Sequence, residues 1–315
     1  MSYPRAFAFW PLALLAAALL LPKLLGIFGY DFYVGFASRI MIMALLASSL
    51  NLLVGVGGMV SLGHAAFFGA GAYTVAILAR EWGGTPAASA LLSWPLAMLV
   101  SALLAACIGA VCLRTRGVYF IMSTLAFAQM LFYVFLSLKS YGGDDGMSMT
   151  KRSTLPGLDL GSDVVFYYVV LALLGIALLL LGRLGASRFG IVLRGIKDNE
   201  LRMESLGYAV FRFKLVAFVV AGAMAGLAGA LMSNLNNFVS PNMMHWEQSG
   251  VVLVMVILGG LGQLWGGLAG AAVFLLLEEI LPAFLPHWQI LLGIILLAVV
   301  FFAPRGLTGL FRRPA

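Results

Sequence analysis

Long apolar stretches recur along the whole chain, and they constrain its fold more than any other feature. A helix of about 20 apolar residues crosses the roughly 30 Å hydrocarbon core of a bilayer. Ten stretches of about that size, bounded by polar or Gly/Pro clusters, occupy residues 7–28, 34–54, 63–79, 89–113, 118–138, 165–182, 213–233, 249–262, 264–281 and 290–303. The sequence therefore predicts an all-α, polytopic transmembrane helical bundle of about 8–10 spans that forms one domain over residues 1–315.

Two neighbouring stretches allow a second interpretation. Residues 249–262 are short for a full crossing, and the connection "GGLGQLWGG" to the next stretch is rich in glycine. Residues 249–281 therefore form either two full spans or a re-entrant pair, which is tolerated only where protein buries the backbone. Both alternatives leave the flanking segments on the same side of the membrane.

Charge is sparse and lies mostly in the connections. Only 10% of residues are charged and 63% are hydrophobic, whereas about a quarter of the residues in soluble proteins are charged. The net charge of +7 could indicate a nucleic-acid partner, but most of the Lys and Arg residues lie between the apolar stretches. That distribution is typical of a membrane orientation signal, so we expect a lipid bilayer and no nucleic acid as partner.

The longest charged connection contains "RFGIVLRGIKDNELRMESLGY", residues 188–208. If this insert is cytoplasmic and the spans alternate, its side carries 13 of the 19 Lys and Arg residues and the other side carries six. Because basic residues favour the cytoplasmic side, the insert and both termini are predicted to be cytoplasmic. The opposite side carries nine of the 12 acidic residues and a polar loop at 139–163.

The insert has the pattern of two short helices. One apolar face is formed at helical spacing by Phe189, Val192, Leu193 and Ile196. Asn199 is suited to cap a second helix, "ELRMESL", and Gly207 to end it. Glu200 and Glu204 repel each other at i, i+4, so we expect a compensating group outside the helix. A loop that only sets topology remains an alternative, but caps and mixed charge favour a rigid element that a cytoplasmic partner binds.

No motif for nucleotide binding or catalysis occurs in the chain. G-x-x-x-x-G-K-[ST] is absent, so no P-loop holds ATP here, and no HExxH motif, nucleophile elbow or metal-ligand cluster indicates an enzyme. Glu278 and Glu279 are the only acids inside the predicted spans, at the outer end of one, and His64 lies near the inner end of another. Ion coupling usually requires ionisable residues at membrane depth, so it is the weaker alternative.

Glycine-rich segments supply two further sets of candidate residues. Small residues at i, i+4 spacing allow close helix packing in lipid; Gly222 and Gly226 have this spacing, and Gly229 follows one turn on. The stretch from Gly55 to Gly71 is predicted to break a helix at membrane depth, as occurs around transport pathways. Three residues would then border the pathway, namely Asn51, Ser61 and His64.

Five blocks carry a family resemblance, and they follow in order over most of the chain. They are "NLLVGVGGMVSLGHAAFFGAGAY" at 51–73, "RTRGVYFIMSTLAFAQM" at 114–130, the insert with the following helix at 187–231, "VILGGLGQLWGGLAGA" at 256–271 and "FAPRGL" at 302–307. Together they resemble the permease subunits of branched-chain amino acid ABC importers, and the second block is more similar to the M-type permease. The sequence departs at Met59, where the family pattern leads us to expect a more polar residue.

The resemblance implies a coupling role for the insert, about residues 187–208, which would dock on a cytoplasmic ATPase. The coupling positions carried over are Arg194, Asp198, Asn199, Glu200, Glu204 and Gly207. It further implies a bacterial inner-membrane protein that translocates leucine, isoleucine or valine, with a second homologous permease, two ATPase subunits and a periplasmic substrate-binding protein as partners. ATP and Mg would be bound by the ATPases, and this chain would bind no cofactor or metal. Permeases for urea and short amides are similar to this group, so those cargoes remain alternatives.

Overall fold

The computed structural model describes residues 17–23, 25–26, 32–83, 88–283, 287–302 and 306–310. Most of the first predicted span and both termini lie outside these ranges. The longer helices are α2 (Phe32–Asn51), α3 (His64–Glu81), α4 (Ala90–Cys112), α5 (Val118–Ser137), α6 (Asp163–Ala186), α9 (Val210–Asn236), α10 (Trp246–Gly259), α11 (Gly266–Ile280) and α12 (Trp288–Phe302). Shorter elements are α7 (Arg188–Asp198), α8 (Glu200–Ser205), α13 (Leu307–Leu310), the π-helical turn η2 (Leu52–Val56), the 3₁₀ turns η4 (Lys139–Tyr141), η5 (Gly143–Asp145), η6 (Pro241–Met244) and η7 (Leu281–Ala283), and the strands β1 (Met147–Ser148) and β2 (Phe238–Val239).

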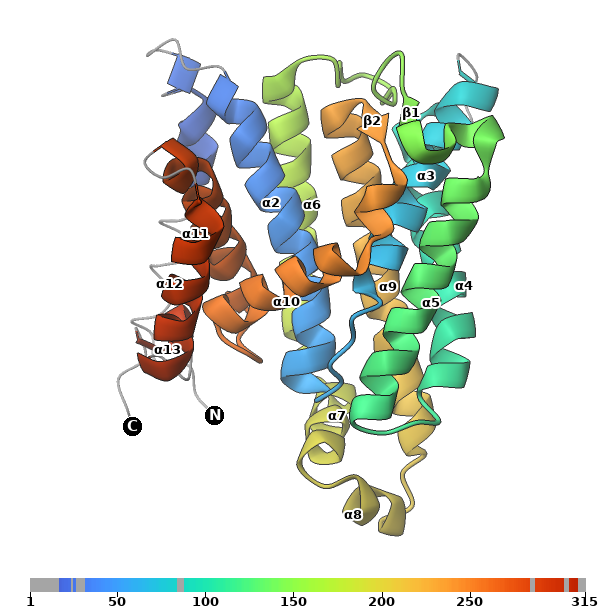
Figure 1. Ribbon diagram of the computed structural model, residues 1–315, viewed down its shortest axis with the longest axis vertical. Coiled ribbons are helices and arrows are strands. Elements are labelled where there is room, and N and C mark those ends of the chain that lie inside the picture. Colours follow the sequence, from blue (N-terminus) through green and yellow to red (C-terminus); the bar gives the residue numbers. More distant parts are fainter. Residues whose placement is uncertain are drawn as a thin grey trace.

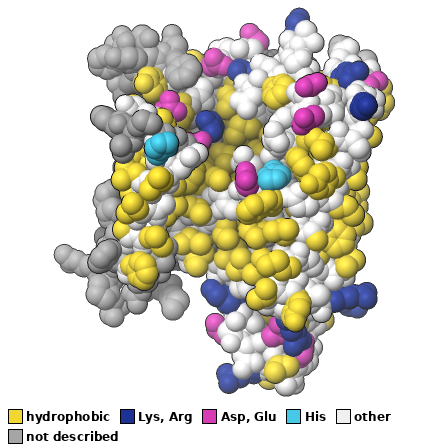
Figure 2. Space-filling model, in the orientation of Figure 1, with side chains coloured by type: hydrophobic (Ala, Val, Ile, Leu, Met, Phe, Trp, Pro, Cys, Tyr) yellow, Lys and Arg dark blue, Asp and Glu magenta, His cyan; other side chains and the backbone are white. Residues whose placement is uncertain are grey.

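The helices confirm the predicted class of fold. Each predicted apolar stretch from 34–54 onward contains a helix, and 6 helices in the described part are long and apolar enough to cross a membrane. Helices α10 and α12, with 14 and 15 residues, are shorter than a full span. Figure 2 shows hydrophobic side chains over a broad band of the surface, with charged side chains gathered toward its two ends. The chain is a multi-pass helical membrane protein.

Helix α9 lies at the centre of the bundle, between α3, α4 and α2 (Figure 1). In its most apolar window 72% is buried, against 17% for the peripheral α5. The predicted small residues face the neighbouring helices: a Cβ on Gly222 would meet Ala105, one on Gly226 would meet Ser101, and one on Gly229 would collide with the backbone oxygen of Phe68. The structure thus places all three glycines at the close helix contacts.

Two spans are interrupted within the bundle. After α2 the chain makes the π-helical turn η2, runs without helix through residues 57–63, and begins α3 only at His64. In the second half, β2 and η6 lead inward from the opposite end, and α10 begins in the middle of the bundle (Figure 1). Met244 of η6 packs closely on Gly69 of α3, so the non-helical segment before α10 lies against the helix that follows the first interruption. The glycine-rich stretch from Gly55 is therefore broken, as its sequence predicts.

Residues 246–281 do not form a simple re-entrant pair. Helix α10 runs to a turn at 260–265, and α11 returns from that turn along α2, with Arg39 of α2 near Glu278 of α11. With η7, α11 is long enough to span the membrane, whereas α10 is completed by the non-helical residues before it. The pair is therefore one full span and one discontinuous span.

The two ends of the bundle differ. Helices α7 and α8 project from one end, which we call the hairpin end (Figure 1). At the opposite end, the polar loop 139–163 is ordered by an antiparallel pairing of β1 with β2, in which Met147 faces Val239. Arg152 holds this loop to the bundle, since its guanidinium donates to the backbone oxygens of Asn234 and Leu160 and pairs with Asp163 at 2.6 Å.

Candidate functional site

The projecting hairpin is capped in the manner its sequence predicts. Asn199 Oδ1 accepts a hydrogen bond from the backbone N–H of Arg202 at 2.9 Å, which starts α8. Gly207 has a φ of 85°, a conformation that favours glycine, and its N–H bonds the oxygen of Glu204. The N–H of Tyr208 bonds the oxygen of Met203, which completes a Schellman motif. Local hydrogen bonds therefore fix the shape of the hairpin.

The repulsion between Glu200 and Glu204 is compensated from two other elements. Arg116, in the turn between α4 and α5, lies 3.6 Å from Glu200 and 3.2 Å from Glu204. Lys214 of α9 pairs with the other oxygen of Glu200 at 2.7 Å, and its side chain is only 13% exposed. The hairpin is thus held to the ends of three neighbouring helices by charge as well as by its apolar face.

The remaining coupling candidates face outward. Arg194 Nη1 donates to the backbone oxygen of Gly185 at the end of α6, and Asp198 lies exposed at the end of α7. Leu201 and Leu206 of the second helix are also exposed. These side chains leave an unusually apolar tip on an otherwise charged hairpin, which suits a protein partner better than water.

One lysine of the hairpin reaches the first interrupted span. Lys197 Nζ donates a 2.8 Å hydrogen bond to the backbone oxygen of Gly55 in η2. Its aliphatic stem packs on Gly58, and Leu193 of the same helix contacts Gly57. A π-helical turn leaves backbone oxygens without their usual helical donors, so Lys197 occupies an acceptor that the break has freed.

The predicted pathway residue Asn51 joins the end of α2 to the turn between α10 and α11, at the far end of the second interrupted span. Asn51 Oδ1 accepts from the N–H of Gly262 at 2.8 Å, and Asn51 Nδ2 donates to the oxygen of Gln263 at 2.7 Å. The turn between α10 and α11 is therefore fixed by the two functional atoms of a single buried amide. Gly55 and Gly262 approach so closely that no side chain fits between them.

His64 and Ser61 lie buried where α3 begins. Ser49 Oγ lies 2.7 Å from His64 Nε2 and donates its proton to the oxygen of Leu46. Because that hydroxyl proton is used, His64 must donate from Nε2, which leaves Nδ1 as an acceptor. Among the described residues Nδ1 has no hydrogen-bond partner. Ser61 Oγ accepts from the N–H of Gly63, so the two residues border the break, but this conformation shields them from solvent.

Glu247 lies in the first turn of α10, so a helix of the second interrupted span carries an acid that the predicted spans did not include. The N–H of Ala65 donates to Ser249 Oγ, so the first turns of α3 and α10 meet. Helix α3 has 18 residues, so its first turn lies roughly 25 Å along the axis from its end opposite the hairpin. Glu247 precedes Ser249 by two residues and is 72% exposed. Acids within membrane-spanning segments face protein or a water-filled cavity rather than lipid.

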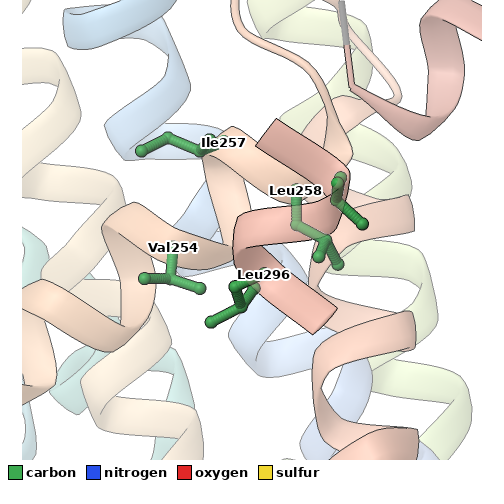
Figure 3. A pocket seen from close by; sticks show the side chains of 5 residues that line it. Val254, Ile257, Leu258 and Leu296 are labelled. Atoms are coloured by element: carbon green, nitrogen blue, oxygen red, sulfur yellow. The ribbon is translucent and has the colours of Figure 1, made fainter. Parts of the chain in front are cut away.

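Two hollows differ sharply in chemistry. The one in Figure 3 lies between α10 and α12, has about 70 Å³ and is lined only by aliphatic side chains such as Val254 and Leu296, so it offers nothing to a polar ligand. An open cleft of about 320 Å³ at the end opposite the hairpin is lined by Arg39, Arg152 and the two acids Asp163 and Glu279. Its charges suit a ligand that carries both signs. Among the described residues, no group of His, Cys, Asp and Glu is arranged to hold a metal ion.

A multi-pass bundle with interrupted spans and a hairpin linked to the interruption is the architecture of a membrane transport subunit. Residues 32–300 match the family described as branched-chain amino acid transport system, permease component. The chain belongs to this family.

Curated relatives agree with the family match. The high-affinity branched-chain amino acid transport system permease protein LivM of Salmonella typhimurium is 31% identical over 306 residues, which cover 89% of this chain and 70% of LivM. LivM of Escherichia coli is 30% identical over the same shares. A probable branched-chain amino acid transport permease protein LivH of Methanocaldococcus jannaschii is 27% identical over 45% of this chain and 46% of its own length. No solved structure is significantly similar to the chain.

Proposed function

We propose that this chain is the membrane-spanning permease subunit of an ABC importer, through which leucine, isoleucine or valine crosses the bacterial inner membrane. The observation that carries the proposal is the similarity to two LivM permeases over most of both chains. The chain itself catalyses no reaction and binds no cofactor, because ATP and Mg are bound by two partner ATPase subunits. A second homologous permease completes the pathway, and a periplasmic binding protein delivers the cargo.

In this proposal the hairpin is the coupling element, with both chain termini and the hairpin in the cytoplasm. Its capped helices and paired charges make it stiff, so a displacement imposed by an ATPase moves it as a unit. The hydrogen bond from Lys197 to Gly55 passes that displacement to η2. Asn51 then links η2 to the turn between α10 and α11. These three hydrogen bonds support communication between the ATPase side and both interrupted spans.

The close glycine contacts suit the same function. Smooth helix faces around α9 allow α3 and α4 to lie against it with little side-chain interlocking. Such faces shift relative to each other without unpacking large side chains. The shielded Asn51, Ser61 and His64 are the proposed pathway residues, and in this closed conformation they are out of reach of water.

Reconstitution tests the proposal. In proteoliposomes that contain both permeases, the ATPases and the binding protein, we expect ATP-dependent uptake of leucine, isoleucine and valine, with unlabelled amino acids competing and urea not competing. The purified chain alone is expected to show neither ATP hydrolysis nor accumulation under an ion gradient. Accumulation by the single chain would overturn the proposal in favour of an ion-coupled transporter, and competition by urea or short amides would change the cargo.

A further inference from the structure

An ionisable pair at the start of α10 lies on an open face of the chain. His245 Nδ1 is 3.7 Å from Glu247 Oε2, and the exposed fractions of the two side chains are 29% and 72%. The His245 ring packs on Phe132 of α5 at 5.2 Å between ring centroids, which fixes the histidine against the bundle. Glu247 has no such anchor among the described residues, so its carboxylate projects away from the chain.

The depth of this pair excludes both bulk water and a stable lipid environment. Ser249, one turn further along α10, contacts the first turn of α3 deep in the bundle. Figure 2 shows an acidic side chain beside a histidine within the hydrophobic band. Charged residues at such depth face a protein interior or a water-filled cavity rather than lipid tails. The face that carries Glu247 is therefore covered in the assembled protein by something polar.

A cleft of mixed charge lies at one end of the bundle. The cleft at the end opposite the hairpin carries guanidinium groups from Arg39 and Arg152 and carboxylates from Asp163 and Glu279. A zwitterion is the kind of solute that such mixed charge accommodates, since each sign finds a counterpart. Below this end, α10 starts at Trp246, which is 43% exposed and offers an aromatic surface next to the carboxylate.

We propose that Glu247 contacts the cargo inside the translocation pathway, where its carboxylate accepts the ammonium group of the amino acid while His245 orients it. This inference rests on the proposed function, because it places the pathway between this face and the second permease. A charge-assisted hydrogen bond to a carboxylate is among the stronger polar contacts that a protein makes. A carboxylate selects for an ammonium group, so a cargo without one would be translocated poorly.

The first test is uptake by the full reconstituted complex. Glu247→Gln keeps the size of the side chain and removes its charge, so we expect leucine uptake to fall about tenfold or more, while subunit assembly and basal ATP hydrolysis stay unchanged. Glu247→Asp is expected to recover a part of the uptake. Glu81→Gln, which removes an exposed acid at the outer end of α3, is the matched control and is expected to transport normally.

The second test asks where the side chain lies, and it does not depend on the cargo. Both native cysteines are first replaced, by Cys107→Ser and Cys112→Ser. In this background Glu247→Cys in the assembled complex should react with a water-soluble cationic methanethiosulfonate. Addition of leucine-loaded binding protein with ATP should change the rate of this labelling reaction. Leu99→Cys, a mid-helix position on the exposed face of α4, is the lipid-facing control and should not react.

The outcomes separate this inference from the proposed function. Failure of the unaltered complex to transport any branched-chain amino acid overturns the proposed function, whatever the labelling shows. Normal uptake by Glu247→Gln, or labelling of Glu247→Cys as slow as that of Leu99→Cys, overturns only the cargo contact. Loss of the second permease on purification of Glu247→Gln also overturns it, and assigns Glu247 to the contact between the two permeases.

Discussion

Lys197 Nζ and the backbone oxygen of Gly55 lie 2.8 Å apart, although 142 residues separate them in the chain. The hydrogen bond connects the middle of the projecting hairpin to the π-helical turn that ends α2. The Gly55 oxygen lacks its usual helical N–H donor, and Lys197 of α7 supplies a donor in its place. The first interrupted span is consequently sensitive to the position of the hairpin.

Removal of this donor is expected to uncouple the two activities of the complex. Lys197→Met keeps the aliphatic stem that packs on Gly58 and deletes Nζ. We expect ATP hydrolysis to continue while leucine uptake per ATP falls several-fold, measured in parallel in the same proteoliposomes. Arg188→Met, on the same helix and exposed, is the control. An unchanged ratio of uptake to hydrolysis in Lys197→Met would remove this lysine from the coupling route.

Charge reversal in α8 is expected to abolish transport without affecting membrane insertion. Glu200→Lys with Glu204→Lys sets two cations beside Arg116 and Lys214, which now hold the hairpin. Partly exposed pairs contribute little each, but reversal of two at once converts attraction to repulsion at the base of the hairpin. Uptake should fall below about a tenth, and added Arg116→Glu should restore part of it. Full uptake in the double variant contradicts the coupling assignment.

Loss of the Asn51 amide is expected to destabilise the chain. Asn51→Leu removes the hydrogen bonds of the side chain to the N–H of Gly262 and the oxygen of Gln263. Each lost hydrogen bond costs about 0.5–1.5 kcal/mol, so the thermal midpoint in detergent should drop by several degrees. Asn51→Asp keeps the acceptor for the N–H of Gly262, so its thermal midpoint should lie between those of Asn51→Leu and the unaltered chain. Equal midpoints for Asn51→Leu and the unaltered chain would show that the turn is held by other contacts.

A single methyl group at Gly229 is expected to separate α9 from α3. The Cβ of Gly229→Ala would collide with the backbone oxygen of Phe68, which cannot rotate away. Overpacking of this kind costs about 1–3 kcal/mol. Gly175→Ala in α6, where a Cβ meets nothing within 4 Å, is the matched control and should be neutral or slightly stabilising. The unfolding midpoints of Gly229→Ala and Gly175→Ala, measured in the same detergent, test this expectation.

Local patterns in the sequence were sufficient for much of this fold. Apolar length placed the helices, and the caps at Asn199 and Gly207 followed from residue types that act on their immediate neighbours. The depth of Glu247 did not follow, because α10 starts inside the bundle only through its contact with α3. Polar residues make up half of the segment from Asn236 to Glu247, so hydropathy alone predicts an outer loop there. The bond from Lys197 to Gly55 likewise depends on tertiary packing that no local pattern encodes.

The fastening of loop 139–163 by Arg152 determines where motion is possible. That guanidinium spans the last turn of α9, the start of α6 and the loop between them, and it also lies 4.9 Å above the ring of Phe166. Arg152 thereby fixes the end of the bundle that lies opposite the hairpin. A pull applied at the hairpin would swing the helices about the fixed end as about a pivot, and the hairpin end would move furthest.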